Sequence, residues 1–147
     1  MESIELREPV ILDIPADPAS LGLMRGLVER IVHRMEFPRE EADRMVLAVD
    51  EACSNIIRHA YGNLQGGRIV VTFGIYDDRL EVRIRDFASP ADPQTFRARD
   101  LEKVRPGGLG MHFMRSAVDE MEYELPPDGG MLLKMVKYRV NKEVPET

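Results

Sequence analysis

One change of hydrophobic period constrains the fold of this chain more than any other feature. Across residues 21–60, apolar side chains recur every three or four positions, which is typical of amphipathic helices. Two later runs, at residues 69–75 and 80–84, alternate apolar and polar side chains instead. Alternation with a period of two predicts strands, because successive strand residues point to opposite faces of a sheet. The chain must therefore pack helices against a sheet.

The rest of the pattern completes an α+β fold. The expected elements, in chain order, are a strand at residues 10–14, helices at 21–35 and 38–60, strands at 68–75 and 80–84, a helix at 109–120, and strands at 121–125 and 131–140. Asp17 followed by Pro18 is typical of a helix start. Because several strands follow one another without helices between them, we predict a two-layer α/β sandwich: a mostly antiparallel mixed sheet with helices on one face.

Length and composition limit the organisation of the chain. Its 147 residues suffice for one hydrophobic core, so we expect residues 1–147 to form a single domain. The 44% of hydrophobic residues includes no run near the roughly 20 needed to cross a bilayer. The amino terminus resembles neither a signal nor a transit peptide. Cys53 is the only cysteine, which agrees with a reducing compartment, and we expect a cytoplasmic protein.

The charge distribution argues against nucleic acid as a partner. The net charge is −6, whereas broad binding to DNA or RNA needs a basic face. One basic cluster stands out in the long, proline-containing segment at residues 88–107, which we expect to be a loop. Its members are Arg97, Arg99, Lys103 and Arg105.

Glu51 and Asn55 form the first candidate site, on the second expected helix. They are one helical turn apart, so both side chains lie on one flank, turned away from the centre of the apolar stripe. Carboxylate and amide oxygens are ligands that Mg²⁺ accepts, and a carboxylate can also take a hydroxyl proton. The same pair would also suit an ordinary solvated helix face.

Two further motifs follow. Asp86 lies at the exit of the second alternating run, where a carboxylate can accept a hydrogen bond from an exocyclic amine or simply begin a turn. Gly107, Gly108 and Gly110 precede or open the third helix. Glycines there let backbone N–H groups approach a phosphate, but they are equally compatible with a flexible entry into the helix.

The order and spacing of these motifs resemble a known family. The motifs are Glu51-x-x-x-Asn55-x-x-x-His59-Ala60-Tyr61, Asp86-x-Ala88-x-Pro90-x-Asp92-Pro93 and Gly107-Gly108-Leu109-Gly110-Met111. Together they resemble the ATP-binding domain shared by gyrase and histidine kinases, and within it the bacterial anti-sigma-factor serine kinases. The resemblance extends over nearly the whole chain.

The resemblance implies a role for each motif. Asn55 would hold Mg²⁺ against the phosphates of ATP, Glu51 would be the general base, and Asp86 would bind the adenine amino group. Ala88 stands where the family usually has a glycine beside the adenine, and Met131 stands where relatives often have a threonine. The phosphate side would be formed by backbone amides and a loop closing over ATP, namely Gly107, Gly108, Gly110 and residues 88–107 with Arg105.

The resemblance also implies a function. The chain would phosphorylate a serine of a small anti-sigma antagonist protein and alternatively sequester a sigma factor. The alternative is a non-catalytic protein-binding module of the same fold with weak or no ATP binding. Neither direct nucleic-acid contact nor a membrane is implied, and a homodimer is left open.

Overall fold

The computed structural model describes residues 5–62, 65–88 and 109–139, and every structural statement below concerns these residues. In chain order the elements are β1 (Val10–Pro15), a short 3-10 turn η1 (Pro18–Ser20), α1 (Leu21–Arg34), α2 (Arg39–Asn55), a π-helical turn η2 (Ile56–Ala60), β2 (Arg68–Ile75), β3 (Arg79–Asp86), α4 (Leu109–Ala117), β4 (Glu120–Glu124) and β5 (Met131–Tyr138).

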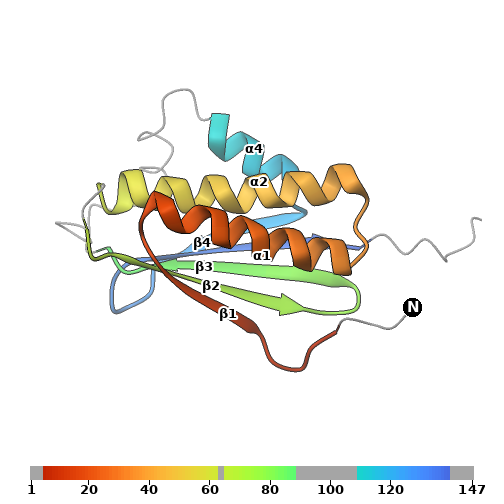
Figure 1. Ribbon diagram of the computed structural model, residues 1–147. Helices are drawn as coiled ribbons and strands as arrows, with labels where there is room; N and C mark the ends of the chain where they lie inside the picture. Colours follow the sequence, from red (N-terminus) through yellow and green to blue (C-terminus); the bar gives the residue numbers. More distant parts are fainter. Residues whose placement is uncertain (1–4, 63–64, 89–108, 140–147) are drawn as a thin grey trace, which may run out of the picture.

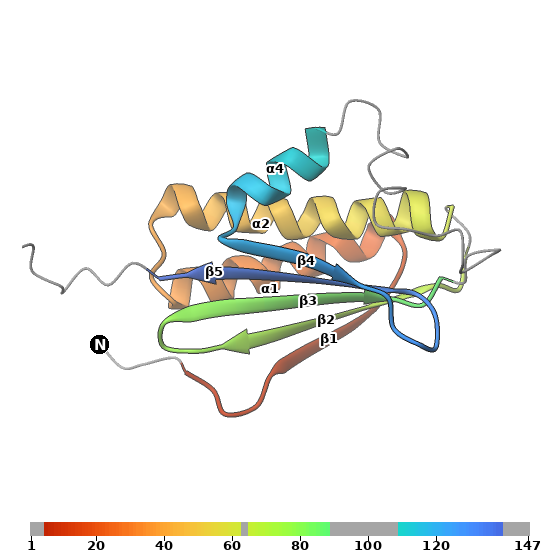
Figure 2. The same ribbon diagram turned by 180° about the vertical axis from the view of Figure 1, so that it is seen from behind.

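The strands form one sheet in the order β1-β2-β3-β5-β4. Each of the strand pairs in the described ranges is antiparallel, so the expected mixed character is not seen there. Helices α1 and α2 lie side by side on one face of the sheet, and α4 packs on α2 (Figures 1 and 2). The predicted α+β fold with helices on one face is confirmed.

The core fills the space between the helices and the sheet. Met24 and Val28 of α1 are completely buried, as are Ile69, Val71 and Phe73 of β2. These are the positions that the helical and alternating periods assign to the inner faces. Each such side chain contributes about 1.5–3 kcal/mol through its removal from water.

Two helix ends differ from the prediction. Regular α-helix ends at Asn55, and the next turn widens so that the N–H of Tyr61 donates to the C=O of Ile56 at 3.0 Å. The last helix ends at Ala117, three residues before the expected end. The reason is that the N–H of Asp119 already donates to the C=O of Val136 in β5. Pairing with a neighbouring strand therefore ends that helix.

The start of the first helix follows the prediction in part. Asp17 Oδ1 accepts a hydrogen bond from the N–H of Ala19 at 2.8 Å, as an N-cap does. The residue it caps belongs to η1, which leads directly into α1. In the described part of the chain, the helices are all too short or too polar to cross a bilayer.

The turn between α1 and α2 contains a residue in an unfavourable backbone conformation. Glu36 is exposed and has φ 58°, in the left-handed region. Its N–H donates to the C=O of His33 and the N–H of Phe37 donates to the C=O of Val32, which is the Schellman pattern of a helix end. Glycine usually occupies this position because it has no Cβ to crowd the backbone.

We expect Glu36→Gly to raise the free energy of unfolding by about 0.5–1 kcal/mol, because it removes that crowding. Glu36→Ala is the matched control, since it removes the carboxylate but keeps the Cβ. Urea unfolding of the three proteins measures the difference. An equal gain in both variants would assign the effect to the charge instead.

Candidate functional site

Three elements with predicted site residues end on the same side of the molecule. The C-terminal half of α2 and the end of β3 lie toward one end in both views, and the N-terminal end of α4 points toward that end (Figures 1 and 2). These elements carry Glu51 and Asn55, Asp86, and Gly110, respectively. Segments far apart in the sequence are thus placed around one end of the helical layer.

Arg58 connects the two predicted residues of α2. Its Nη2 donates to Asn55 Oδ1 at 2.9 Å and lies 3.9 Å from Glu51 Oε1. A single guanidinium nitrogen can reach both oxygens only if they share a flank, as the helical spacing predicted. Arg58 follows Glu51 by seven residues and Asn55 by three, so the same spacing could have identified it. No role for Arg58 was predicted from the sequence.

The environments of Glu51 and Asn55 differ. The Glu51 side chain is 33% exposed, whereas Asn55 is only 6% exposed as a residue. The flank that carries both residues is therefore partly exposed at Glu51 and buried at Asn55. Asn55 is the last residue of α2, directly before the π-helical turn.

The Asn55 amide retains hydrogen-bonding capacity that the described residues do not use. Its Nδ2 is buried without a hydrogen-bond partner. A buried amide N–H without an acceptor costs about 1–3 kcal/mol, so a phosphate oxygen or water there would be favourable. Its Oδ1 has a second lone pair beyond the Arg58 contact, and Glu51 adds a carboxylate nearby. These hard oxygen donors fit Mg²⁺ together with a phosphate.

Asp86 is a buried carboxylate at the end of β3, 5% exposed. Burial raises its pKa to about 6, although the N–H groups of Ala88 and Met131 and the charge of Arg85 oppose the increase. The N–H of Ala88 donates to Asp86 Oδ1 at 3.1 Å. Fixed backbone donors thus orient the carboxylate, and a ligand amine is a chemically suitable further donor.

The turn between β4 and β5 packs against the backbone of Asp86. Gly130 has φ 72°, and a Cβ added there would overlap the carbonyl oxygen of Asp86. Arg85 Nη2 donates to the Gly129 carbonyl at 3.1 Å and to Asp128 Oδ1 at 3.0 Å. Met131, whose position the family resemblance marked as unusual, contributes its backbone N–H to Asp86 instead of a side-chain hydroxyl.

The remaining predicted residues fall into two groups. Gly110 is the second residue of α4, and the backbone N–H of Ala88 is bonded to Asp86 as described. Arg105, Gly107, Gly108 and the rest of the predicted loop from residue 89 onward lie outside the described residues. Their expected roles stay predictions.

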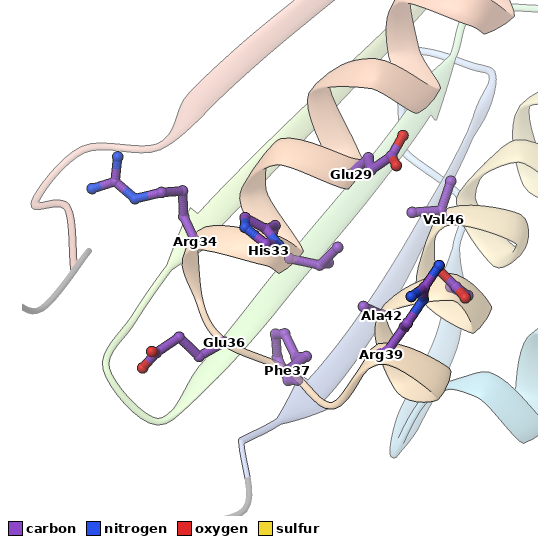
Figure 3. Close-up of a pocket in the computed structure, with 10 residues that line it drawn as sticks. Glu29, His33, Arg34, Glu36, Phe37, Arg39, Ala42 and Val46 are labelled. Atoms are coloured by element: carbon purple, nitrogen blue, oxygen red, sulfur yellow. The ribbon is translucent and has the colours of Figure 1, made fainter. Parts of the chain in front are cut away.

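A groove of about 880 Å³ lies at the other end of α2, beside the turn from α1 (Figure 3). Its lining carries both signs of charge, including Glu29 from α1 and Arg39 from α2, together with His33. Sixteen residues of helix separate Arg39 from Asn55, or about 24 Å at 1.5 Å per residue. The groove is therefore separate from the candidate site.

Comparison with known proteins agrees with this arrangement. A family model described as the histidine kinase-like ATPase domain matches residues 14–137. The chain belongs to this family. Among its relatives, the serine-protein kinase RsbW of Bacillus pumilus is 32% identical over 153 residues, covering 97% of this chain and 90% of that protein. The family resemblance inferred from the motifs is confirmed.

Other relatives carry the same name. The serine-protein kinase RsbW of Listeria innocua is 32% identical over 149 residues, covering 96% of this chain and 94% of that protein. The RsbW of Bacillus subtilis is 29% identical over 136 residues, covering 86% and 83%. The similarity thus spans most of the length of each protein.

Proposed function

We propose that this chain is an ATP-dependent protein-serine kinase that phosphorylates a small anti-sigma antagonist protein and sequesters a sigma factor. The observation that carries the proposal is the grouping, at one end of the fold, of a buried, oriented carboxylate with a carboxylate–amide pair. The proposal is also supported by relatives that are named serine-protein kinase and are similar to this chain over most of their length.

In this proposal Asp86 recognises the base. Its carboxylate would accept a hydrogen bond from the adenine amino group, beside the backbone of Ala88. Asn55 would hold Mg²⁺ through Oδ1 and donate from Nδ2 to a phosphate oxygen, which satisfies its unpartnered N–H. When bound, Mg²⁺ supplies neutralisation of the phosphate charge.

Glu51 is the proposed general base. The serine hydroxyl oxygen would attack the γ-phosphorus, the bond from that phosphorus to the bridging oxygen would break, and ADP would leave. The serine proton would pass to the Glu51 carboxylate, which is partly exposed and so open to a protein substrate. Backbone amides of Gly107, Gly108 and Gly110, together with Arg105, would stabilise the phosphates.

We further propose that residues 1–147 form a single domain and that the protein is cytoplasmic. Its partners would be proteins, with no direct contact to nucleic acid. The net charge of −6 suits basic protein surfaces better than polyanions.

The test is phosphate transfer to a candidate antagonist protein. The chain, Mg-ATP labelled on the γ-phosphate and the antagonist should give labelled antagonist, with phosphoserine located by mass spectrometry. A sigma factor should bind the chain in a pull-down without the antagonist. ATP binding with no transfer to the antagonist would overturn the kinase activity, and weak or no ATP binding together with sigma-factor capture would favour the non-catalytic binding module.

A further inference from the structure

The hydroxyl of Tyr61 occupies an unusual place between two strands. Tyr61 directly follows the π-helical turn η2, and its O–H donates to the C=O of Arg68 at 2.7 Å. The same oxygen accepts a hydrogen bond from the N–H of Phe87 at 2.8 Å. One side chain from the end of the helix thus contacts the first residue of β2 and the residue after β3.

The strand register shows what this hydroxyl replaces. The last paired residues are Ile69 and Asp86, so Arg68 and Phe87 would form the next pair. In antiparallel strands, hydrogen-bonded pairs alternate with pairs that are not hydrogen-bonded. The N–H of Tyr76 donates to the C=O of Arg79, and counting in steps of two from that pair makes Arg68 and Phe87 a hydrogen-bonded pair. The Tyr61 oxygen is inserted between the N–H and C=O that would otherwise bond directly.

The insertion changes the spacing of the strands next to Asp86. A direct N–H···O bond would bring donor and acceptor to about 2.9 Å, whereas here each contacts the inserted oxygen. The backbone that leaves β3 is therefore held away from β2 directly after Asp86. Asp86 and Ala88, which are hydrogen-bonded to each other, flank this point.

The surrounding chain is adapted to the ring. A Cβ at Gly67 would lie 2.8 Å from two ring carbons of Tyr61, so any larger residue there would displace the ring. The ring is partly buried against the core. The Tyr61 side chain is thus fixed twice: its ring by packing, and its hydroxyl by hydrogen bonds.

We infer that Tyr61 is a positioning residue for adenine recognition: its hydroxyl holds the exit of β3 apart from β2, so that Asp86 and the Ala88 backbone are spaced to receive the base. This inference rests on the proposed function. The Tyr61 side chain also connects the end of β3 to the helix that carries Asn55, because Tyr61 follows that helix after one π-helical turn.

Tyr61→Phe tests the inference, because it keeps the ring and removes only the hydroxyl. Phe87 can then bond directly to Arg68, which closes the strands beside Asp86. Calorimetry with ADP should show binding weakened about tenfold, the equivalent of one buried hydrogen bond. Binding of inosine diphosphate, which lacks the adenine amino group, should change much less. The preference for ADP should therefore fall.

Tyr138→Phe is the matched control. It also removes a tyrosine hydroxyl, which bonds Glu120 at 2.6 Å in the sheet region remote from Asp86, and it should leave both affinities unchanged. Gly67→Ala is a second variant, expected to weaken ADP binding by moving the ring without removing the hydroxyl. Thermal melting verifies that each variant folds.

The outcomes separate the two ideas. If the parent protein binds no ADP, the proposed function and this inference both fail. If the parent binds ADP and Tyr61→Phe keeps the parental affinity and the parental preference over inosine diphosphate, only the positioning role is overturned. A loss of thermal stability with that preference intact would likewise assign the hydroxyl a purely structural role.

Discussion

Glu51→Gln is expected to slow phosphate transfer by about 100-fold or more while leaving ADP affinity unchanged, because general-base catalysis typically contributes that much. The amide keeps the shape of the side chain but cannot accept the serine proton. In the proposed site, ADP binding would depend instead on Asp86 and Asn55, which the change leaves in place. Single-turnover transfer and calorimetry with ADP measure the two effects separately.

Glu40→Gln provides the matched control for this experiment. Glu40 lies on the same helix and also pairs with an arginine. Its Oε1 lies 3.8 Å from Arg44 Nη2, and Glu51 Oε1 lies 3.9 Å from Arg58 Nη2. It is in the first turn of α2, eleven residues or about 16 Å from Glu51. A similar slowing in both variants would show that lost helix ion pairs, and not a lost base, reduce the rate.

The fold was largely predictable because the spacing of apolar residues distinguishes its helices from its strands. Alternating residues 69–75 and 80–84 gave strands that pair as a hairpin, β2 with β3. The π-helical turn after Asn55 could not be predicted, since its residues continue the helical period. What distinguishes it is its wider hydrogen bonding, as in the bond from the N–H of Tyr61 to the C=O of Ile56. The early end of α4 likewise depends on pairing with β5, a contact between distant parts of the chain.

The candidate site was predictable where a motif lies within one element. The Glu51 and Asn55 spacing placed both on one flank, as the shared contact to Arg58 shows. The burial of Asn55 depends on how neighbouring elements pack, and a local sequence pattern does not predict this packing. The Tyr61 hydroxyl was equally hidden, because its partners, Arg68 and Phe87, are backbone groups that any sequence would supply.

Asp86→Asn is expected to change nucleotide affinity and pH dependence together. The carboxylate has two acceptor oxygens for the N–H groups of Ala88 and Met131 and for a ligand amine, whereas an amide has one. ADP binding should weaken by about 10- to 100-fold, the range for losing a hydrogen bond to a charged group. Asp119→Asn is the control, since Asp119 also accepts a backbone N–H, from Tyr138, but at the other end of β5.

The pH dependence follows from the raised pKa of Asp86, about 6 in the folded protein against an ordinary value of 3.8. Between these values the folded state binds more protons than the unfolded state, so this group lowers stability as pH rises. Its contribution should fall by about 2 kcal/mol from pH 4.5 to pH 7.5 and then stay constant. Asp86→Asn removes it, so the variant should gain that amount relative to the parent over the same range. Urea unfolding at both pH values gives this double difference, and an unchanged difference would mean that the Asp86 carboxylate is not desolvated in the folded protein.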